Sequence, residues 1–202
     1  QDIYKIIVSN SFVFLPGSLD GDELSKLIGA YNDNNFSIEN LTIQNGNSNS
    51  GGGIKLIDNS SPLIKNVIFK DNYVTHVGTH VFCGNNSNPI FENVTFKGGD
   101  YSNNAGISLF SYCNPVFMNC IIEDNYNIDT ASGGVSCLSS YSPIFINTKF
   151  INNRGSGSWG SSAIGFLFGS SEESPLLKTA QFVIMALLSV CLLYTSPSPR
   201  DS

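Results

Sequence analysis

Two aspartates occupy matching places in two similar segments, Phe69-Lys-Asp-Asn72 and Ile122-Glu-Asp-Asn125. Two carboxyl groups held about 5–9.5 Å apart can hydrolyse a glycosidic bond, one as an acid and the other as a nucleophile or base. Asp71 and Asp124 are therefore the candidate catalytic pair. The alternative is that both are turn residues facing water, because aspartate and asparagine favour turns. The elements that position them must decide between these roles.

The two histidines, His76 and His80, are four residues apart. On a helix this spacing would suggest a zinc site. The segment here has the composition of a loop and a strand, and no third ligand is evident, so we expect neither a metal nor a cofactor. His80 stands where similar segments have Gly or Ala, and we interpret the difference as a local bulge.

The segments that carry these residues belong to an internal repeat. Similar segments begin at Pro62, Pro89, Pro115, Pro143 and Pro175, after an earlier copy at 36–43 without the proline. Each contains an asparagine, and the intervals between successive asparagines are 26, 27, 26 and 28, with Thr179 in the last copy. Each copy then continues through a polar loop into a strand that begins with small residues. The asparagines are Asn40, Asn66, Asn93, Asn119 and Asn147.

The apolar columns of the repeat predict its architecture. Alternate residues of a strand point to one face, and the apolar spacing shifts from even to odd across each asparagine, as in Phe91-Glu-Asn-Val94. A sharp bend at the asparagine keeps both flanking apolar residues inside. The pattern predicts an all-β, right-handed parallel β-helix of five to six coils, with three short strands per coil and a repeat length of 26 to 32. A helical repeat is excluded by the proline and Gly-Gly punctuation.

Stacking gives the repeated asparagines a structural role. Neighbouring coils would lie about 4.8 Å apart, so identical amides could hydrogen-bond along the axis and satisfy a buried corner. The residues that precede the asparagines include Glu39, Lys65 and Glu92, whose alternating charges favour in-register stacking. Met118 and Ile146 interrupt this column, which indicates either a covering loop or a contact surface.

The same spacing separates the reactive side chains. Asp71 and Asp124 would be two coils apart, with Gly99 between them, at about 9.6 Å. This is near the upper limit for an inverting glycosidase. Cys83 and Cys137 would also lie two coils apart, beyond disulfide reach. We therefore interpret the cysteines as small core residues, with Cys113 in a turn.

Glycosylation sequons occur at five asparagines, and the turn residues Asn59 and Asn85 are the candidate acceptors. Asn40 and Asn93 are excluded as acceptors by their expected burial in the ladder. The remaining sequon is that of Asn35.

The repeat resembles that of the polymorphic outer membrane protein family. The resemblance rests on Gly52-Gly-Ile54 and Gly133-Gly-Val135, and on Phe69-Lys-Asp-Asn72 and Phe150-Ile-Asn-Asn153. It covers roughly residues 36 to 182 and implies surface display and adhesion, with no catalytic residues to carry over. The copy that begins at Pro89 departs from it, because Phe96-Lys-Gly-Gly99 lacks the asparagine.

Composition narrows the function classes. The net charge is −6, and the arginines are Arg154 and Arg200. There is therefore no basic stripe for nucleic acid or anionic membrane. We expect a lead-in or degenerate coil over 1–35, with strands at 4–9 and 11–15 and a helical turn at 22–28. Coils follow over 36–182, and then a poorly structured tail over 183–202.

The ends of the chain carry expectations of their own. Residues 191–202 resemble a translated sequencing adaptor, and 182–190 are too short to span a membrane. A signal peptide would lie upstream, and further repeats would flank this stretch.

The expected function is a non-catalytic cell-surface or secreted scaffold that contacts a glycan or protein. One alternative is a polysaccharide-cleaving lyase or inverting glycosidase that uses Asp71 and Asp124. The other is an internal spacer of a much larger surface protein.

Overall fold

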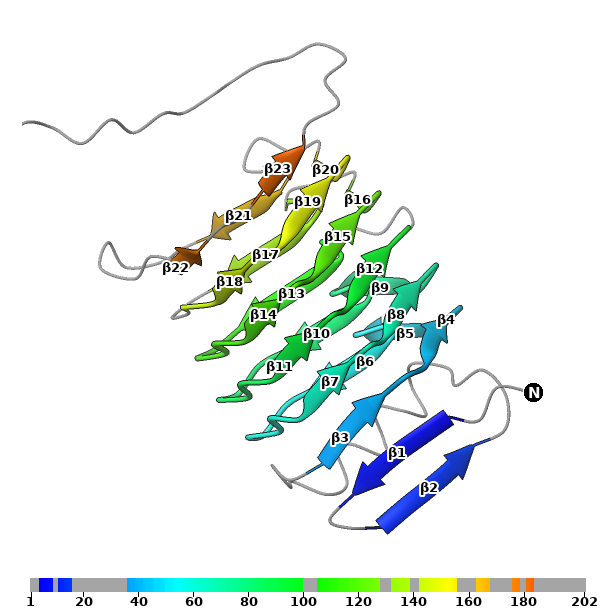
Figure 1. The fold of residues 1–202 in the computed structure, drawn as a ribbon. Coiled ribbons are helices and arrows are strands. Elements are labelled where there is room, and N and C mark those ends of the chain that lie inside the picture. The colour runs from blue at the N-terminus through cyan, green and yellow to red at the C-terminus, as the bar shows by residue number, and fades with distance from the viewer. Residues whose placement is uncertain are drawn as a thin grey trace, which may run out of the picture.

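A computed structural model of the chain describes residues 4–8, 11–15, 36–99, 105–127, 132–138, 142–155, 163–167, 176–178 and 181–183. These residues form strands and no helix. Figure 1 shows the strands stacked in successive layers along one axis. The predicted all-β parallel solenoid is confirmed.

The first sheet takes one strand from each coil, and these coil strands pair in parallel. Ile64, Phe91 and Phe117 are direct partners across it, as the predicted register requires. We number the coils by their strand in this sheet. The coil strands of this sheet are β3 (Phe36–Glu39), β7 (Leu63–Lys65), β11 (Ile90–Glu92), β14 (Val116–Met118), β18 (Ile144–Ile146) and β22 (Leu176–Lys178).

The second and third sheets complete each coil. The second contains β4 (Thr42–Gln44), β8 (Ile68–Lys70), β12 (Thr95–Lys97), β15 (Ile121–Glu123), β19 (Lys149–Ile151) and β23 (Gln181–Val183). The third contains β6 (Ile54–Leu56), β10 (Val81–Cys83), β13 (Ile107–Phe110), β17 (Val135–Leu138) and β21 (Ile164–Leu167). Five coils therefore have all three strands, and β22 and β23 begin a sixth.

Two short parallel pairs were not predicted. β5 (Asn47–Ser50) pairs with β9 (Tyr73–Val77), and β16 (Tyr126–Asn127) pairs with β20 (Arg154–Gly155). They lie between the second and third sheets, where the sequence indicated polar loops. The third coil, which contains Gly98-Gly99, contributes no strand to either pair in the described part of the chain.

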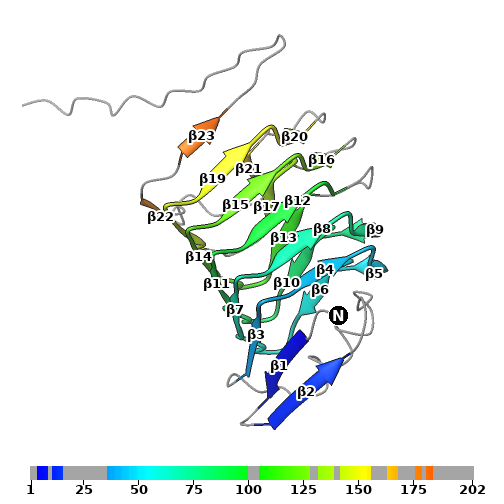
Figure 2. The ribbon, with the colours of Figure 1, turned by 45° about the vertical axis from the view of Figure 1, so that its right-hand side comes forward.

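The first strands form a hairpin rather than a degenerate coil. β1 (Tyr4–Val8) and β2 (Ser11–Leu15) pair antiparallel, and β1 also pairs antiparallel with β3. Figure 2 shows this hairpin beside β3 at one end of the stack. The predicted strands are present, but two intervening residues permit only an antiparallel connection, because a parallel crossover needs about a dozen. The helical turn expected at 22–28 lies outside the described residues.

Residues with positive φ form the corners of each coil. The repeated asparagines between the first and second sheets have φ of 48–59°, a left-handed conformation that asparagine tolerates better than most residues. The next corner follows the second sheet and has positive φ at Asn45, Asp71, Gly98, Asp124 and Asn152. The predicted bend at the asparagines is therefore present.

The core is the column of inward side chains. Phe91, Phe117 and Phe145 stack with ring centroids 4.9 Å apart, and Phe69 stacks on Phe96 at 5.2 Å. All five rings are fully buried, as are the aliphatic side chains packed with them, those of Ile43, Ile54 and Ile64. Removing this apolar surface from water is the main contribution that stabilises the coils.

Candidate functional site

The candidate carboxylates lie on one column of corners. Lys70 pairs with Lys97, and Lys97 with Glu123, so the next residues, Asp71, Gly98 and Asp124, share one position. The residue between the two aspartates is therefore Gly98 and not Gly99. The sequence prediction named the wrong one of two adjacent glycines, while the strand register itself, with Phe96 between Phe69 and Ile122, is as predicted.

Both carboxylates are exposed and lie near cations. Asp71 is 3.3 Å from the Lys70 Nζ, and Asp124 is 3.9 Å from the Lys97 Nζ. Asp124 also accepts a hydrogen bond of 2.7 Å from the Asn152 amide. Both aspartates have positive φ, 49° and 54°, as corner residues do. Both side chains face water at these corners.

The asparagines of the first corner form an axial ladder on the surface, which we call the outer ladder. Asn66 donates to Asn40 at 2.9 Å, Asn93 to Asn66 at 3.3 Å, and Asn147 to Asn119 at 2.7 Å, each from Nδ2 to Oδ1. All five residues are exposed. The expectation of a buried corner is wrong, because the bend that turns Ile38 and Leu41 inward points Asn40 outward.

The exposed outer ladder changes the argument about glycosylation. Burial no longer excludes Asn40 and Asn93 as acceptors. Asn59 and Asn85 are exposed turn residues with positive φ, and the Asn85 amide donates to Asp58 at 3.0 Å. Asn35 lies outside the described residues.

A second asparagine column is buried, which we call the inner ladder. Its members Asn72, Asn125 and Asn153 each follow a second-corner residue and are 0–5% exposed. Each Nδ2 donates to a carbonyl of the preceding coil, those of Ile43, Phe96 and Ile122, at 2.7–3.2 Å. Each Oδ1 accepts from a backbone N–H of that coil, those of Gly46, Gly99 and Asn125, at 2.9–3.3 Å. These amides satisfy backbone groups that water cannot reach.

His80 fills the place that the third coil leaves open in the inner ladder. Gly99 takes the ladder position there and has no side chain. The His80 Nδ1 lies 3.1 Å from the Asn72 Nδ2, and its Nε2 lies 2.9 Å from the Asn125 Oδ1. The imidazole, which is fully buried, thus bridges the second and fourth coils. It is part of the ladder and not a bulge.

The first and third coils cannot accommodate a side chain at the position of His80, and the fifth coil has only the small Ala163 there. A Cβ on Gly53 would lie 3.1 Å from the Asn72 Nδ2, and one on Gly106 would lie 2.8 Å from the Asn125 Cγ. A ladder asparagine thus needs glycine in the coil below it, and a missing asparagine leaves room for histidine. This exchange could have been found in the sequence, because His80 and Gly99 both depart from the repeat pattern and lie in adjacent coils.

The network determines the protonation of His80. Asn72 donates to the Ile43 carbonyl, so its Nδ2 is also the donor to His80 Nδ1, and Asn125 Oδ1 accepts from His80 Nε2. The neutral Nε2–H tautomer fits both contacts. Burial lowers the pKa of His80 to about 4 and outweighs the hydrogen bond to Asn125 and the nearby Asp71 carboxylate, which raise it.

His76 does not join His80. It lies exposed in β9, in a stretch where the pairing with β5 shifts register between Ser48 and Ser50. The irregular pairing therefore lies around His76, whereas the bulge was expected at His80. In the described part of the chain, no group of three His, Cys, Asp or Glu residues could hold a metal ion.

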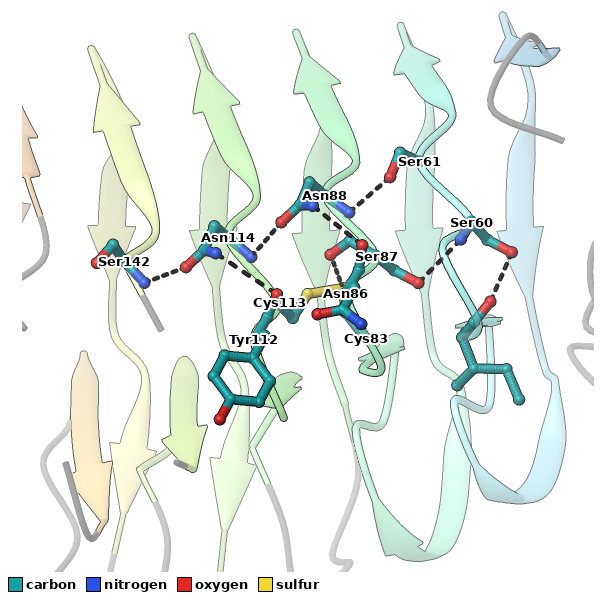
Figure 3. Close-up of a disulfide and its surroundings, with 11 residues drawn as sticks. Ser60, Ser61, Cys83, Asn86, Ser87, Asn88, Tyr112, Cys113, Asn114 and Ser142 are labelled. Carbon is teal, nitrogen blue, oxygen red and sulfur yellow. Dashed lines mark hydrogen bonds between the residues drawn. A yellow bond between two sulfur atoms is a disulfide. The ribbon is translucent and has the colours of Figure 1, made fainter. Parts of the chain in front are cut away.

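Cys83 and Cys113 form a disulfide that the sequence interpretation missed. Their Cα atoms are 6.1 Å apart. Figure 3 shows the bond joining the second coil to the third, beside a row of hydrogen-bonded Ser61, Asn88, Asn114 and Ser142. The repeat pattern places only Cys137 in the inward column of Cys83, two coils away and beyond disulfide reach, and it assigns Cys113 to a turn. The turn side chain points inward, where Ser87 lies in the coil below.

The two other described cysteines are buried thiols. Desolvation raises the pKa of Cys120 to about 12 and raises that of Cys137 as well. Cys120 donates weakly to the carbonyls of Phe91 and Met118, at 3.5 and 3.4 Å. These thiols are core residues, as predicted for them, and have no nucleophilic character at neutral pH. Cys191 lies outside the described residues.

Comparison with known proteins gives one family. The family model described as the right-handed beta helix region matches residues 24–168. No curated protein and no solved structure matches the chain significantly. In the described part of the chain, no helix is long and apolar enough to cross a membrane.

Proposed function

The chain belongs to the right-handed β-helix family, and we propose that it is a non-catalytic extracellular or cell-surface scaffold that contacts a glycan or protein. The family alone does not decide this, because one fold can carry many functions. The observation that carries the proposal is the structural use of the reactive side chains. His80 and the Cys83–Cys113 pair join coils, and Asp124 is held by Asn152 and Lys97.

The disulfide supports a location outside the cytosol. Disulfides persist in oxidising compartments and are rare where thiols are kept reduced. The polar, stacked surface of Asn and Ser corners suits a secreted or surface protein that must remain folded without a globular core.

The outer face of the first sheet is the proposed contact surface. Each strand of this sheet has two outward positions beside its core residue. The first is apolar from the second coil onward, whereas the second is charged at Lys65 and Glu92 and becomes apolar at Met118 and Ile146. Ile90 exposes 39% of its surface, and its neighbours are partly exposed. Contiguous apolar surface on a soluble protein often marks an interaction site. The residues of this surface are Leu63, Ile90, Val116, Met118, Ile144 and Ile146.

Binding of the purified chain to cells and to a glycan array tests the proposal. We expect retention that Ile90→Lys and Met118→Lys weaken at least tenfold. Thr95→Lys, on the outward face of the second sheet, is the matched control and should bind like the wild type. Equal loss in all three variants would contradict the assignment of the surface. Absence of any binding would favour the spacer hypothesis.

The enzymatic alternative rests on Asp71 and Asp124 lying on one column two coils apart. A panel of acidic and neutral polysaccharides tests it. We expect no turnover by the wild type. Turnover that Asp71→Asn or Asp124→Asn abolishes, while Asp58→Asn at another exposed corner retains it, would overturn the non-catalytic proposal.

A further inference from the structure

We propose that His80 makes the joint between the second and fourth coils sensitive to acid, because protonating its ring removes the acceptor that the inner ladder needs there. The inference goes beyond the scaffold role and rests on the geometry of the inner ladder. Elsewhere in the inner ladder, an asparagine of one coil lies next to a glycine of the preceding coil. Here the order is reversed: Gly99 is in the third coil and His80 is in the second. An asparagine amide does not titrate near neutral pH, and an imidazole does.

The contacts of Asn72 leave no alternative partner for a protonated ring. An imidazolium would carry a hydrogen on Nδ1 and direct it at the Asn72 Nδ2, which is itself a donor. Flipping the Asn72 amide, which exchanges its oxygen and nitrogen, does not relieve this conflict. It would place Oδ1 against the Ile43 carbonyl and Nδ2 against the Gly46 N–H, where bonds of 3.1 and 2.9 Å now exist.

The surroundings of the ring are apolar or neutral. Phe69 of β8 and Phe96 of β12 lie with ring centroids 6.4 Å from it, and Asn125 bonds its other nitrogen. The lysines of these strands, Lys70 and Lys97, are on the outward face.

The carboxylates near the ring are also outside the core. Glu123 of β15 is partly buried and pairs with Lys97 at 3.1 Å. Asp71 and Asp124 are exposed corners, and the Asp71 carboxylate acts on His80 in the direction that favours the charged ring. It does not contact the ring, so among the described residues no carboxylate compensates a buried imidazolium.

The direction of the pH effect follows from linkage. The pKa of His80 is lowered to about 4 in the folded chain, below its ordinary value of about 6.5. Between these values the unfolded chain binds the additional proton. The stabilisation is therefore present above about pH 6.5 and is lost as the pH falls toward 4, by up to about tenfold in the unfolding equilibrium constant per pH unit.

The double variant His80→Gly/Gly99→Asn tests the proposal, because it restores the pair used in the neighbouring coils. Urea unfolding is measured from pH 7 to pH 5 for it and for the wild type. We expect the wild-type unfolding constant to rise roughly 15-fold more between pH 6.5 and 5. Contributions from carboxylates are common to both proteins and cancel. An equal rise in both would overturn the proposal.

A measurement on the wild type keeps the test independent of whether the double variant folds. ¹⁵N NMR of histidine rings reports tautomer and charge, and His76, exposed in β9, is the internal reference. We expect His80 to remain the neutral Nε2–H tautomer at pH 5, with its signals lost together with the folded state at lower pH. A His80 ring that is protonated at pH 5 while the chain is still folded would overturn the proposal.

Discussion

The two asparagine ladders use one residue type and one repeat with very different consequences. The amides of the outer ladder make only axial side-chain bonds with one another, in contact with water, as between Asn66 and Asn40. Each amide of the inner ladder satisfies backbone groups of the preceding coil, and Asn125 bonds Asn153 and His80 as well. Hydrogen bonds exchanged with water contribute little net stability, whereas orphaned buried groups are costly. The inner ladder therefore contributes more to the free energy of unfolding than the outer ladder does.

The inner ladder and the second-corner column next to it differ in how they tolerate change. The second-corner column is partly or fully exposed and contains asparagine, aspartate and glycine in successive coils, because water satisfies whatever the side chain does not. The inner ladder departs from asparagine at Gly99, and His80 of the adjacent coil supplies the missing contact. A change of residue type at a buried ladder position is thus accompanied by a change at the position that contacts it in the adjacent coil.

The largest expected effect comes from breaking the inner ladder at Asn125. Asn125→Ala leaves the Gly99 N–H, the Phe96 carbonyl and the His80 Nε2–H without their partner. At about 1–3 kcal/mol for each buried unsatisfied group, we expect the free energy of unfolding to fall by about 4 kcal/mol in urea at pH 7. Asn119→Gly in the outer ladder is the control. An equal loss in both variants would contradict the comparison.

The next-largest expected effect comes from the disulfide that holds the third coil, which has no inner-ladder asparagine. The Cys83–Cys113 disulfide joins the third coil to the second, and its cysteines are 30 residues apart in the sequence. A loop of this length corresponds to about 3–4 kcal/mol of stabilisation, which Cys83→Ala/Cys113→Ala should lose. Dithiothreitol should destabilise the wild type and leave the double variant unchanged. Equal sensitivity to the reductant in both would show that the disulfide does not form.

The smallest expected effect comes from substitutions at Asn66 in the outer ladder, which distinguish the contribution of backbone conformation to stability from that of the side-chain hydrogen bonds. Asn66 has φ 53°, which glycine adopts freely and alanine does not. We expect Asn66→Ala to cost about 1 kcal/mol in thermal or urea unfolding and Asn66→Gly less than half of that. If both cost as much as the loss of Asn125, the outer ladder would be as important as the inner one.

Much of the fold follows from the sequence because its signals are local. The alternation around each asparagine predicted that Ile38 and Leu41 both point inward, and the charge alternation agrees with the 2.8 Å contact between Lys65 and Glu92. The hairpin, the burial of the ladders and the partner of Cys83 were not predicted. Each of these depends on which residues of other strands or coils lie beside a given residue.

By itself the sequence determined the repeat, the bend at each asparagine and the stacking register, since strand alternation and positive-φ preference act over a few residues. Only the tertiary structure decided which asparagines are buried and where His80 belongs. His80 meets Asn125, 45 residues away, because the coiling of the chain brings that position back beside it. The same two aspartates that suggested catalysis became exposed corners for this reason: their side-chain direction is set by the bends that turn the neighbouring core residues inward.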